Sequence, residues 1–203
     1  MTAYLRQFRP ALVLLALLTV LLGGVYPVAV FAVGQAVAPA QANGSLEKVS
    51  GAPAASSLIA QAVPEGEKRF FFPRPSAAHW DPAASGASNL GPSDPALKEA
   101  ADKARAAVAA REGVTASSVP QDAVTASASG LDPDISPAYA RLQIPRVARA
   151  NGLSVAEVER LVQESTTTGV ESLLGQESVD TTTLNLAVGH LAKGLSPSGD
   201  LGR

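Results

Sequence analysis

Apolar positions are concentrated in one long run near the N-terminus of this chain. Residues 11–33 include no charged side chain. As an α-helix this run is about 34 Å long, which is enough to cross a hydrocarbon core of about 30 Å. We therefore predict a transmembrane helix over residues 11–33, preceded by a short polar segment, residues 1–10.

Two adjacent glycines, Gly23 and Gly24, interrupt the apolar run. Glycine lowers the surface of a helix, so the backbone of another membrane helix can approach closely at that point. We predict that Gly23 and Gly24 lie at an interface within the membrane.

A cleaved signal peptide is the rival interpretation of the same segment. Arg6 and Arg9 resemble its basic start, and the small residues 40–42 resemble a cleavage site. The apolar run, however, is about twice as long as the core of such a peptide. Its length therefore favours an anchor that stays in the membrane.

The cations around the run indicate its orientation. Arg6 and Arg9 precede it, and the first cation after it is Lys48. Because cytoplasmic flanks carry the excess of Lys and Arg, we predict a single-pass protein of the cell (inner) membrane. Its N-terminus is cytoplasmic and its C-terminal domain extracytoplasmic.

Beyond the run the apolar stretches become short, and Pro, Gly and Ser separate them. Residues 34–50 are small and polar, which predicts a linker. We assign the soluble domain to residues 51–193 and a flexible tail to residues 194–203.

Local signals predict about three helices in the soluble domain. The first begins at Pro95, after the capping residues Ser93 and Asp94, and ends at Gly113. The second covers residues 137–149, with a strained or broken turn at Pro145. The third opens with a capping box at residues 154–157.

A few short strands complete the predicted fold. Residues 58–63, 119–125 and 183–188 are short apolar or alternating runs, and residues 70–72 are three consecutive phenylalanines. We interpret 70–72 as a strand or as a wedge in the core. The predicted class is α+β: one N-terminal transmembrane helix followed by a small mixed domain.

Composition and motifs exclude several classes of function. The chain has no Cys and two His, and its formal net charge is −2, which does not suit a nucleic-acid partner. Neither a P-loop nor a nucleophile elbow is present. His79 and His190 lack partners at metal-ligand spacing, and Asp132-Pro133-Asp134 is better explained as a turn than as a calcium loop. We predict no catalytic residue and no metal site.

The turn-rich strings carry a resemblance to a known family. They are SSLIAQ (56–61), RPSAA (74–78), SGASNLGPSDP (85–95), VTASASGLDPDISPAYARLQIPRVARANGL (124–153) and TTLNLA (182–187). In content and order they resemble the KdpC family, the C subunit of the bacterial Kdp potassium-transporting ATPase. The resemblance covers nearly the whole chain and argues against cleavage of the N-terminal segment.

This chain departs from the family pattern at a few positions. Ala128-Ser129 stands where the family usually has Gly-Ser, Asp134 where it commonly has His, and Ala60 where it has Gly. These departures are local. Asp134 weakens any role proposed for an imidazole at that position.

The resemblance implies a non-catalytic subunit that is needed for assembly of the complex. It implies two partners, a channel-like potassium-binding subunit and a P-type ATPase subunit, whose ATP affinity the family is described as raising in the manner of a catalytic chaperone. Potassium is handled by the partner subunits. No cofactor is expected to bind directly, and ATP enters by family attribution only.

Binding residues concentrate in loops, and the most distinctive strings of this chain lie in loops. We therefore predict that partners dock on two short segments, Ser88, Asn89, Leu90 and Gly91 in the first and Ser129, Gly130, Leu131 and Asp132 in the second. The alternative for these residues is turn formation alone. The alternative for the whole chain is a stand-alone, membrane-anchored envelope binding protein or hydrolase.

Overall fold

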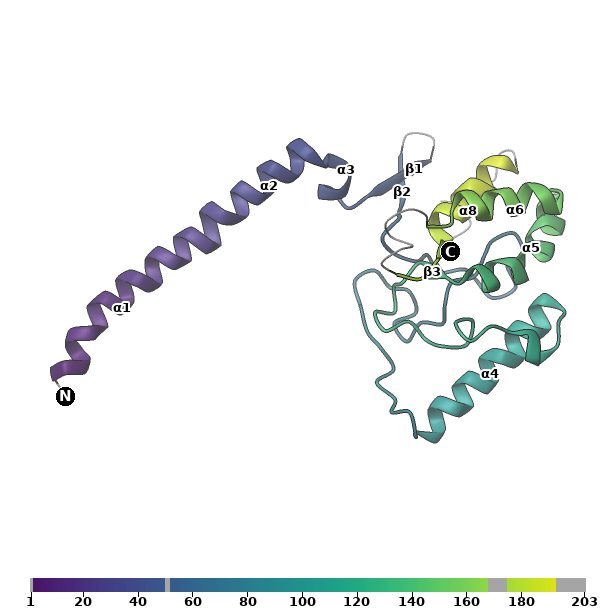
Figure 1. The fold of residues 1–203 in the computed structure, drawn as a ribbon, viewed down its shortest axis with the longest axis horizontal. Helices are drawn as coiled ribbons and strands as arrows, with labels where there is room; N and C mark the ends of the chain where they lie inside the picture. Colours follow the sequence, from purple (N-terminus) through teal and green to yellow (C-terminus); the bar gives the residue numbers. More distant parts are fainter. Residues whose placement is uncertain (1, 50–51, 168–174, 193–203) are drawn as a thin grey trace. The chain divides into compact units, whose positions relative to one another are not determined.

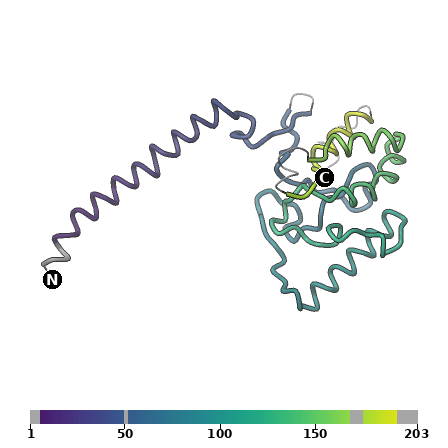
Figure 2. The backbone as a smooth tube through the Cα atoms, viewed as in Figure 1, coloured from purple at the N-terminus to yellow at the C-terminus, as the bar shows by residue number. Residues whose placement is uncertain are grey.

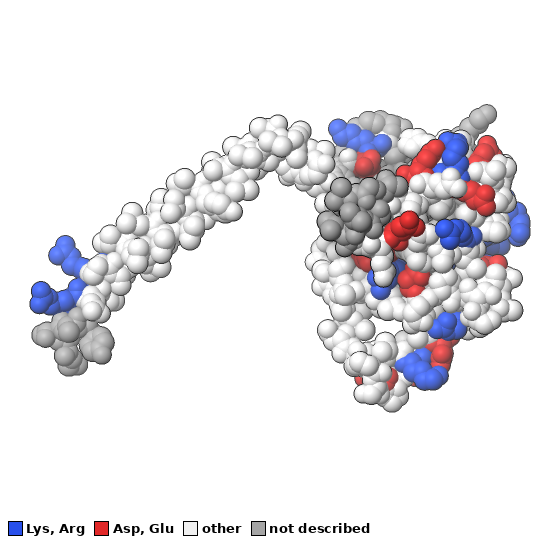
Figure 3. Space-filling view, in the orientation of Figure 1, with Lys and Arg blue, Asp and Glu red and all other residues white. Residues whose placement is uncertain are grey.

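The apolar run forms one long helix in the computed structural model, which describes residues 2–49, 52–167 and 175–192. It consists of α1 (Thr2–Val20), the π-helical turn η1 (Leu21–Val25) and α2 (Tyr26–Val37), placed end to end (Figure 1). In the described part of the chain, Arg6–Val37 is the one helix long and apolar enough to cross a membrane, with a mean hydropathy of 2.4. It extends beyond both ends of the predicted span, and Figure 3 shows basic side chains only at its N-terminal end.

The π-helical turn ends at Val25, two residues before Pro27. The amide of Tyr26 donates to the carbonyl of Leu21. Proline has no N–H, and its ring collides with the carbonyl four residues earlier, which is that of Gly23. A wider turn accommodates the ring without ending the helix. Gly23 and Gly24 both lie in this turn, so they belong to the part of the helix that accommodates Pro27.

After α2 the chain turns back along the helix. Ala38 leaves the helical conformation, and the short helix α3 (Pro39–Ala42) follows. A Cβ atom built on Gly34 would lie 3.5 Å from the Cβ of Ala42. The side-chain amides of Gln35 and Asn43 each donate to the oxygen of the other, over 3.3 and 3.1 Å. The predicted linker, residues 34–50, therefore begins as helix and turn.

A second unit begins at Leu46, before the predicted domain start at residue 51. Its described residues form two antiparallel pairs of strands, which are β1 (Leu46–Val49) with β2 (Ala52–Ser56) and β3 (Asp134–Ile135) with β4 (Val179–Asp180). Leu46 lies opposite Ser56 at the open end of the first pair. The predicted tail, residues 194–203, lies outside the described residues.

Helices form most of the regular structure in this unit. They are α4 (Pro95–Glu112), α5 (Pro137–Asn151), α6 (Val155–Glu164), α8 (Thr181–Leu191) and the 3₁₀ turn η2 (Ala116–Ser118). Helix α5 packs against α4 and α6, and α6 packs against α8. Figure 2 shows that the chain between β2 and α4 follows a long irregular path. The α+β class is confirmed.

The three predicted helices are confirmed, with their caps. Asp94 accepts from the amide of Ala96 over 2.9 Å at the start of α4, and Gly113 ends that helix with φ 70°. The capping box of α6 is formed. Of the two alternatives predicted at Pro145, a strained or a broken turn, the break is wrong, because α5 continues through it to Asn151. Pro145 lies on the exposed side of α5, where the carbonyl that loses its helical donor can bind water.

The strands predicted at 58–63 and 183–188 are wrong, and so is the short extended segment predicted at 119–125. Residues 58–63 and 119–125 form turns and irregular chain, and residues 183–188 belong to α8. Helix α8 is buried on several faces, so its apolar residues do not form one stripe at helical spacing. Their alternation with Thr and Asn imitates a strand. The oxygen of Asp180 accepts from the amide of Thr183 over 2.7 Å and begins the helix.

Candidate functional site

Two turn-rich segments lie against each other in the structure: the first loop (residues 74–91) and the second loop (residues 125–133). The carbonyl of Ser129 accepts two hydrogen bonds from the first loop. One comes from the amide of Gly86 over 2.8 Å and the other from the hydroxyl of Ser85 over 2.9 Å. We call the two segments together the paired loops.

Gly130 lies at the closest approach of the paired loops. Its φ is +72°, and a Cβ atom there would lie 2.7 Å from both the Cβ of Ala78 and the carbonyl oxygen of Gly86. Its own carbonyl accepts from the hydroxyl of Ser76 over 2.7 Å. Only glycine combines this backbone conformation with this close contact, so Gly130 holds the loops together.

Arg74 joins the paired loops through its guanidinium group. It forms an ion pair with Asp132 over 3.1 Å and donates to the carbonyls of Thr125 and Ala126 over 3.3 and 3.4 Å. About a quarter of the Arg74 side chain and a third of the Asp132 side chain are exposed. The pair therefore fixes the geometry of the loops more than it adds to stability.

The first loop also holds residues in left-handed backbone conformations. His79, Trp80 and Asn89 have φ values of 53°, 56° and 54°, which are unfavourable for residues other than glycine. The indole of Trp80 donates to the carbonyl of Arg74 over 3.2 Å, and its amide donates to the hydroxyl of Ser76 over 3.1 Å. Side-chain hydrogen bonds thus hold a strained path in place.

The two predicted docking segments have different settings. Ser129, Gly130 and Asp132 are fastened to residues 74–86 by the contacts above. Ser88, Asn89 and Gly91 are exposed and Leu90 is half-buried. In the described chain, the hydrogen bonds that the first loop forms with the second come from residues 74–86 and not from this segment. The structure thus fastens Ser129–Asp132 to the first loop by hydrogen bonds, whereas Ser88–Gly91 only follows the fastened residues in the sequence.

Sequence reasoning did not single out Arg74, Ser76, Ser85 or Gly86 as site residues. All four lie in the strings RPSAA and SGASNLGPSDP, which carried the family resemblance. The sequence offered one signal for this pairing, a cation, Arg74, in one loop and a carboxylate, Asp132, in the other. Their pairing depends on the three-dimensional path of both loops.

A shallow hollow of about 760 Å³ opens beside the second loop. It is lined by Leu58, Ile59, Arg74, Thr125, Ala126, Ser127, Ala128, Ser129, Leu131, Asp132 and Pro133. The amide of Ala60 donates to the carbonyl of Leu131 over 2.7 Å and joins the segment around Leu58 to this rim. Small hydroxyl-bearing and apolar residues dominate the lining around the Arg74–Asp132 ion pair.

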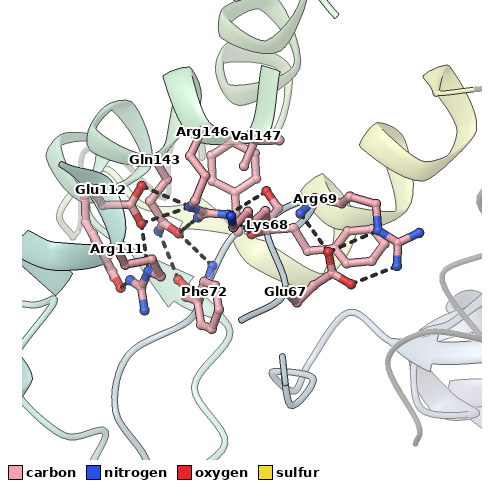
Figure 4. Close-up of polar contacts among 12 residues, drawn as sticks. Glu67, Lys68, Arg69, Phe72, Arg111, Glu112, Gln143, Arg146 and Val147 are labelled. Atoms are coloured by element: carbon pink, nitrogen blue, oxygen red, sulfur yellow. Dashed lines mark hydrogen bonds and ion pairs between the residues drawn. The ribbon is translucent and has the colours of Figure 1, made fainter. Parts of the chain in front are cut away.

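The second notable cluster holds the three phenylalanines. Gln143 accepts from the amide of Phe72 over 2.8 Å and donates to its carbonyl over 3.1 Å, as Figure 4 shows. Asn185 binds the amide and carbonyl of Phe71 in the same way, over 2.7 and 2.9 Å. These side chains replace the partners that a strand would need. Residues 70–72 are therefore a core wedge, one of the two predicted interpretations.

A buried ion pair lies beside that wedge (Figure 4). Arg146 contacts the carboxylate of Glu112 over 3.0 Å, and the Glu112 side chain is fully buried. Arg146 also donates to the carbonyls of Lys68 and Phe70 over 2.8 and 2.9 Å. Burial lowers the pKa of Arg146, while the carboxylate of Glu112 opposes this shift. The pair ties α4 and α5 to the wedge.

An open pocket of about 610 Å³ adjoins this network. Arg111 stacks on the ring of Phe72 at 3.9 Å and donates to the hydroxyl of Tyr139 over 2.8 Å. Arg111 and Arg146 both pair with Glu112. These three charged groups are thus bound to one another, and their cluster serves packing of the core.

The two histidines lie apart from the charged clusters of the described chain. His79 is exposed in the first loop and His190 is exposed near the end of α8. Within the described residues, no group of three or more His, Cys, Asp or Glu side chains is placed to hold a metal ion. Burial raises the pKa of Asp180, and its place at the start of α8 accounts for that carboxylate as a cap.

The two predicted membrane-interface glycines leave open surface on the helix. A Cβ atom on Gly23 or Gly24 would meet nothing within 4 Å. A hollow of about 580 Å³ is lined by Val20, Gly24, Val25, Val28, Ala29 and Ala32. The interface at these glycines remains a prediction.

Comparison with known proteins identifies relatives along nearly the whole chain. The model of the family KdpC, described as "K+-transporting ATPase, c chain", matches residues 8–190. A protein from Kineococcus radiotolerans is 51% identical over 93% of this chain and 95% of its own length. Relatives from Sorangium cellulosum and Geobacter sulfurreducens are 48% and 42% identical, over 91% and 92% of this chain and 97% and 99% of their own lengths.

All three relatives are named "Potassium-transporting ATPase KdpC subunit". The match includes most of the apolar helix together with both paired loops and the charged network. The resemblance seen in the turn-rich strings is confirmed, and this chain belongs to the KdpC family.

Proposed function

We propose that this chain is an accessory subunit of a high-affinity, ATP-driven potassium-uptake complex and is needed for its assembly. The observation that carries the proposal is the family match across residues 8–190. The arrangement of polar groups supports an accessory role, because the ionisable clusters of the described chain are used in caps and ion pairs.

The partners that we propose are a channel-like potassium-binding subunit and a P-type ATPase subunit. The paired loops are the docking surface. Seven contacts hold them to each other, so their outer side is largely organised before a partner arrives. Such preorganisation lowers the entropy lost on binding. In the membrane, the open surface at Gly23 and Gly24 is the second docking site.

We further propose that the paired loops lie outside the cytoplasm. Arg6 and Arg9 precede the apolar run at residues 11–33, and the next cation is Lys48. The positive-inside rule then places residues 46–203 on the outer side of the inner membrane. ATP is cytoplasmic, so a domain there does not touch the nucleotide.

An effect on ATP affinity then has to be indirect. We propose that this subunit raises the ATP affinity of the ATPase subunit by favouring one conformation of the assembled membrane region. Such coupling is reciprocal: ATP then tightens the hold of the complex on this subunit by the same factor.

Assembly tests the docking surface. Ala128 and Ser88 are exposed in the paired loops, whereas Ala100 is exposed on α4. Ala128→Arg and Ser88→Arg add bulk and charge without removing a core contact, and Ala100→Arg is the matched control. Co-purification with a tagged ATPase subunit should fall for the first two variants alone. Equal recovery of all three would contradict the assignment of the surface.

Fusion of a reporter enzyme after residue 203 tests the orientation separately. An enzyme active only outside the cytoplasm should be active there. Activity of a reporter that works only in the cytoplasm would place residues 46–203 inside and would reopen direct contact with ATP.

A further inference from the structure

Two exposed leucines lie at the open end of the β1–β2 hairpin. Leu46 is 51% exposed and Leu58 is 61% exposed. Ser56 connects them, since it lies opposite Leu46 across the hairpin and its hydroxyl accepts from the amide of Leu58 over 3.2 Å. In the described residues 46–192, Val155 is the other large apolar side chain of comparable exposure, at 48%.

The chain between the apolar helix and this hairpin is short. Helix α3 runs back beside the end of α2, so Ala42 lies next to Gly34. Gly34 directly follows the predicted span, residues 11–33. Leu46 comes four positions after Ala42, and four steps of fully extended chain span at most about 14 Å. Leu46 is therefore tethered close to the depth at which the apolar helix leaves the lipid.

The turn at that depth also suits a membrane surface. The amides of Gln35 and Asn43 satisfy each other, and Asn43 donates to the carbonyl of Pro39 over 2.7 Å. Polar groups that bind one another tolerate the loss of water at a lipid interface. The structure thus keeps polar atoms paired in the segment that lies between the helix and the leucines.

From these observations we propose that Leu46 and Leu58 form a second lipid contact, seated at the boundary between headgroups and acyl chains. Apolar side chains beside a membrane bind at that boundary because they leave water without needing a pocket. The hairpin base would then restrict how the soluble unit moves on its tether. The proposal goes beyond the proposed function and rests on it only for the membrane span.

Site-specific labelling tests the contact in the whole chain. The sequence contains no Cys, so Leu46→Cys and Leu58→Cys each create a single labelling site for a polarity-sensitive fluorophore. Val155→Cys is the control of similar exposure, and Val30→Cys reports the apolar helix. Each labelled chain is placed in phosphatidylethanolamine–phosphatidylglycerol vesicles with and without lipids that carry a quencher near the headgroup.

We expect the lipid-borne quencher to reduce emission at positions 46 and 58 several-fold more than at position 155. Quenching at positions 46 and 58 no stronger than at 155 would overturn the lipid contact while leaving the anchor intact. Loss of quenching at position 30 would instead show that the membrane span itself is wrong.

The assembled complex provides the second arm of the same test. If a partner subunit covers the leucines, labels at positions 46 and 58 become shielded from iodide in water but stay unaffected by the lipid-borne quencher. That result would replace the lipid with a protein partner and contradict the proposal. Continued lipid quenching in the complex would support it.

Discussion

The wedge of residues 70–72 and the paired loops both contain irregular backbone whose polar groups need hydrogen-bond partners, but the two regions differ in burial. In both, the backbone is irregular, and side chains supply the hydrogen bonds that a helix or sheet would supply. Gln143 and Asn185 do this for the wedge, whereas Ser76 and Arg74 do it for the loops. The wedge is buried, with Phe70 and Phe71 fully inaccessible, while the loops keep an outer side in solvent.

The difference shows that side chains bound to irregular backbone can stabilise the fold in one region and shape a recognition surface in another. Around the wedge, the side chains that bind its backbone, Gln143 and Asn185, are buried, so a change there acts on folding. In the paired loops, the contacts set the shape of an exposed surface, so a change can act on assembly while the fold is kept. This contrast orders the predictions that follow.

Removing the buried carboxylate should have the largest effect. Glu112→Ala leaves Arg146 buried without its partner, which should lower the free energy of unfolding by about 3–5 kcal/mol. Denaturant unfolding of the purified chain, followed by the fluorescence of its single Trp, measures this. Lys98→Ala breaks the exposed ion pair with Asp102 on the same helix and should cause no measurable change. Equal effects of the two changes would refute the central role of burial.

Gly130→Ala should rank next. A methyl group there combines an unfavourable backbone conformation with a collision against Ala78 and Gly86, which together should lower the free energy of unfolding by about 2–4 kcal/mol. Gly113 also has a positive φ, but a Cβ there meets nothing within 4 Å. Gly113→Ala should therefore cost only about 1 kcal/mol. The difference between the two alanine variants measures how tightly the paired loops pack.

The ion pair that joins the loops should contribute little to folding. A double-mutant cycle with Arg74→Gln and Asp132→Asn should give a coupling of about 0.5–1 kcal/mol, because both side chains are partly exposed. Recovery of the assembled complex should nevertheless fall in either single variant. A coupling energy as large as the loss of stability expected for Glu112→Ala would contradict the contrast between a buried region that stabilises the fold and loops that serve assembly.

Acid should reveal the smallest effect. Hydrogen bonds from the side chain of Arg69, and then from its amide, lower the pKa of Glu67 from 4.5 to about 2. Because this pKa is lower in the folded state, the stabilisation is complete above about pH 4.5 and is lost as the pH falls toward 2. The stability difference between the wild type and Glu67→Gln should therefore shrink across that window. A difference that stays constant down to pH 2 would contradict the assignment.

The sequence carried the parts of the fold that depend on neighbouring residues. Caps and end signals such as Asp94, Gly113 and Ser154 act within a few residues, so the helices they bound were predictable. The strand predicted at 183–188 failed because α8 is buried on several faces. The wedge was predicted only as one of two options, since its hydrogen-bond partners, Gln143 and Asn185, come from distant helices.

The candidate site was predictable in composition but not in arrangement. The distinctive strings pointed to Ser129–Asp132 and Ser88–Gly91 as loop residues. That Ser76 and Gly86 fasten to the first of these segments depends on a close approach at Gly130. Local rules describe turns, but they do not state which two turns meet.

Photo-crosslinking in the membrane tests most directly whether the paired loops dock on a partner. A photoreactive amino acid is placed at Ser88, at Ala128 or, as a control, at Ala100 on α4, in cells that produce the whole complex. We predict crosslinks from Ser88 and Ala128 to the channel-like potassium-binding subunit and none from Ala100. Crosslinks that arise from Ala100 while Ser88 and Ala128 give none would contradict the account.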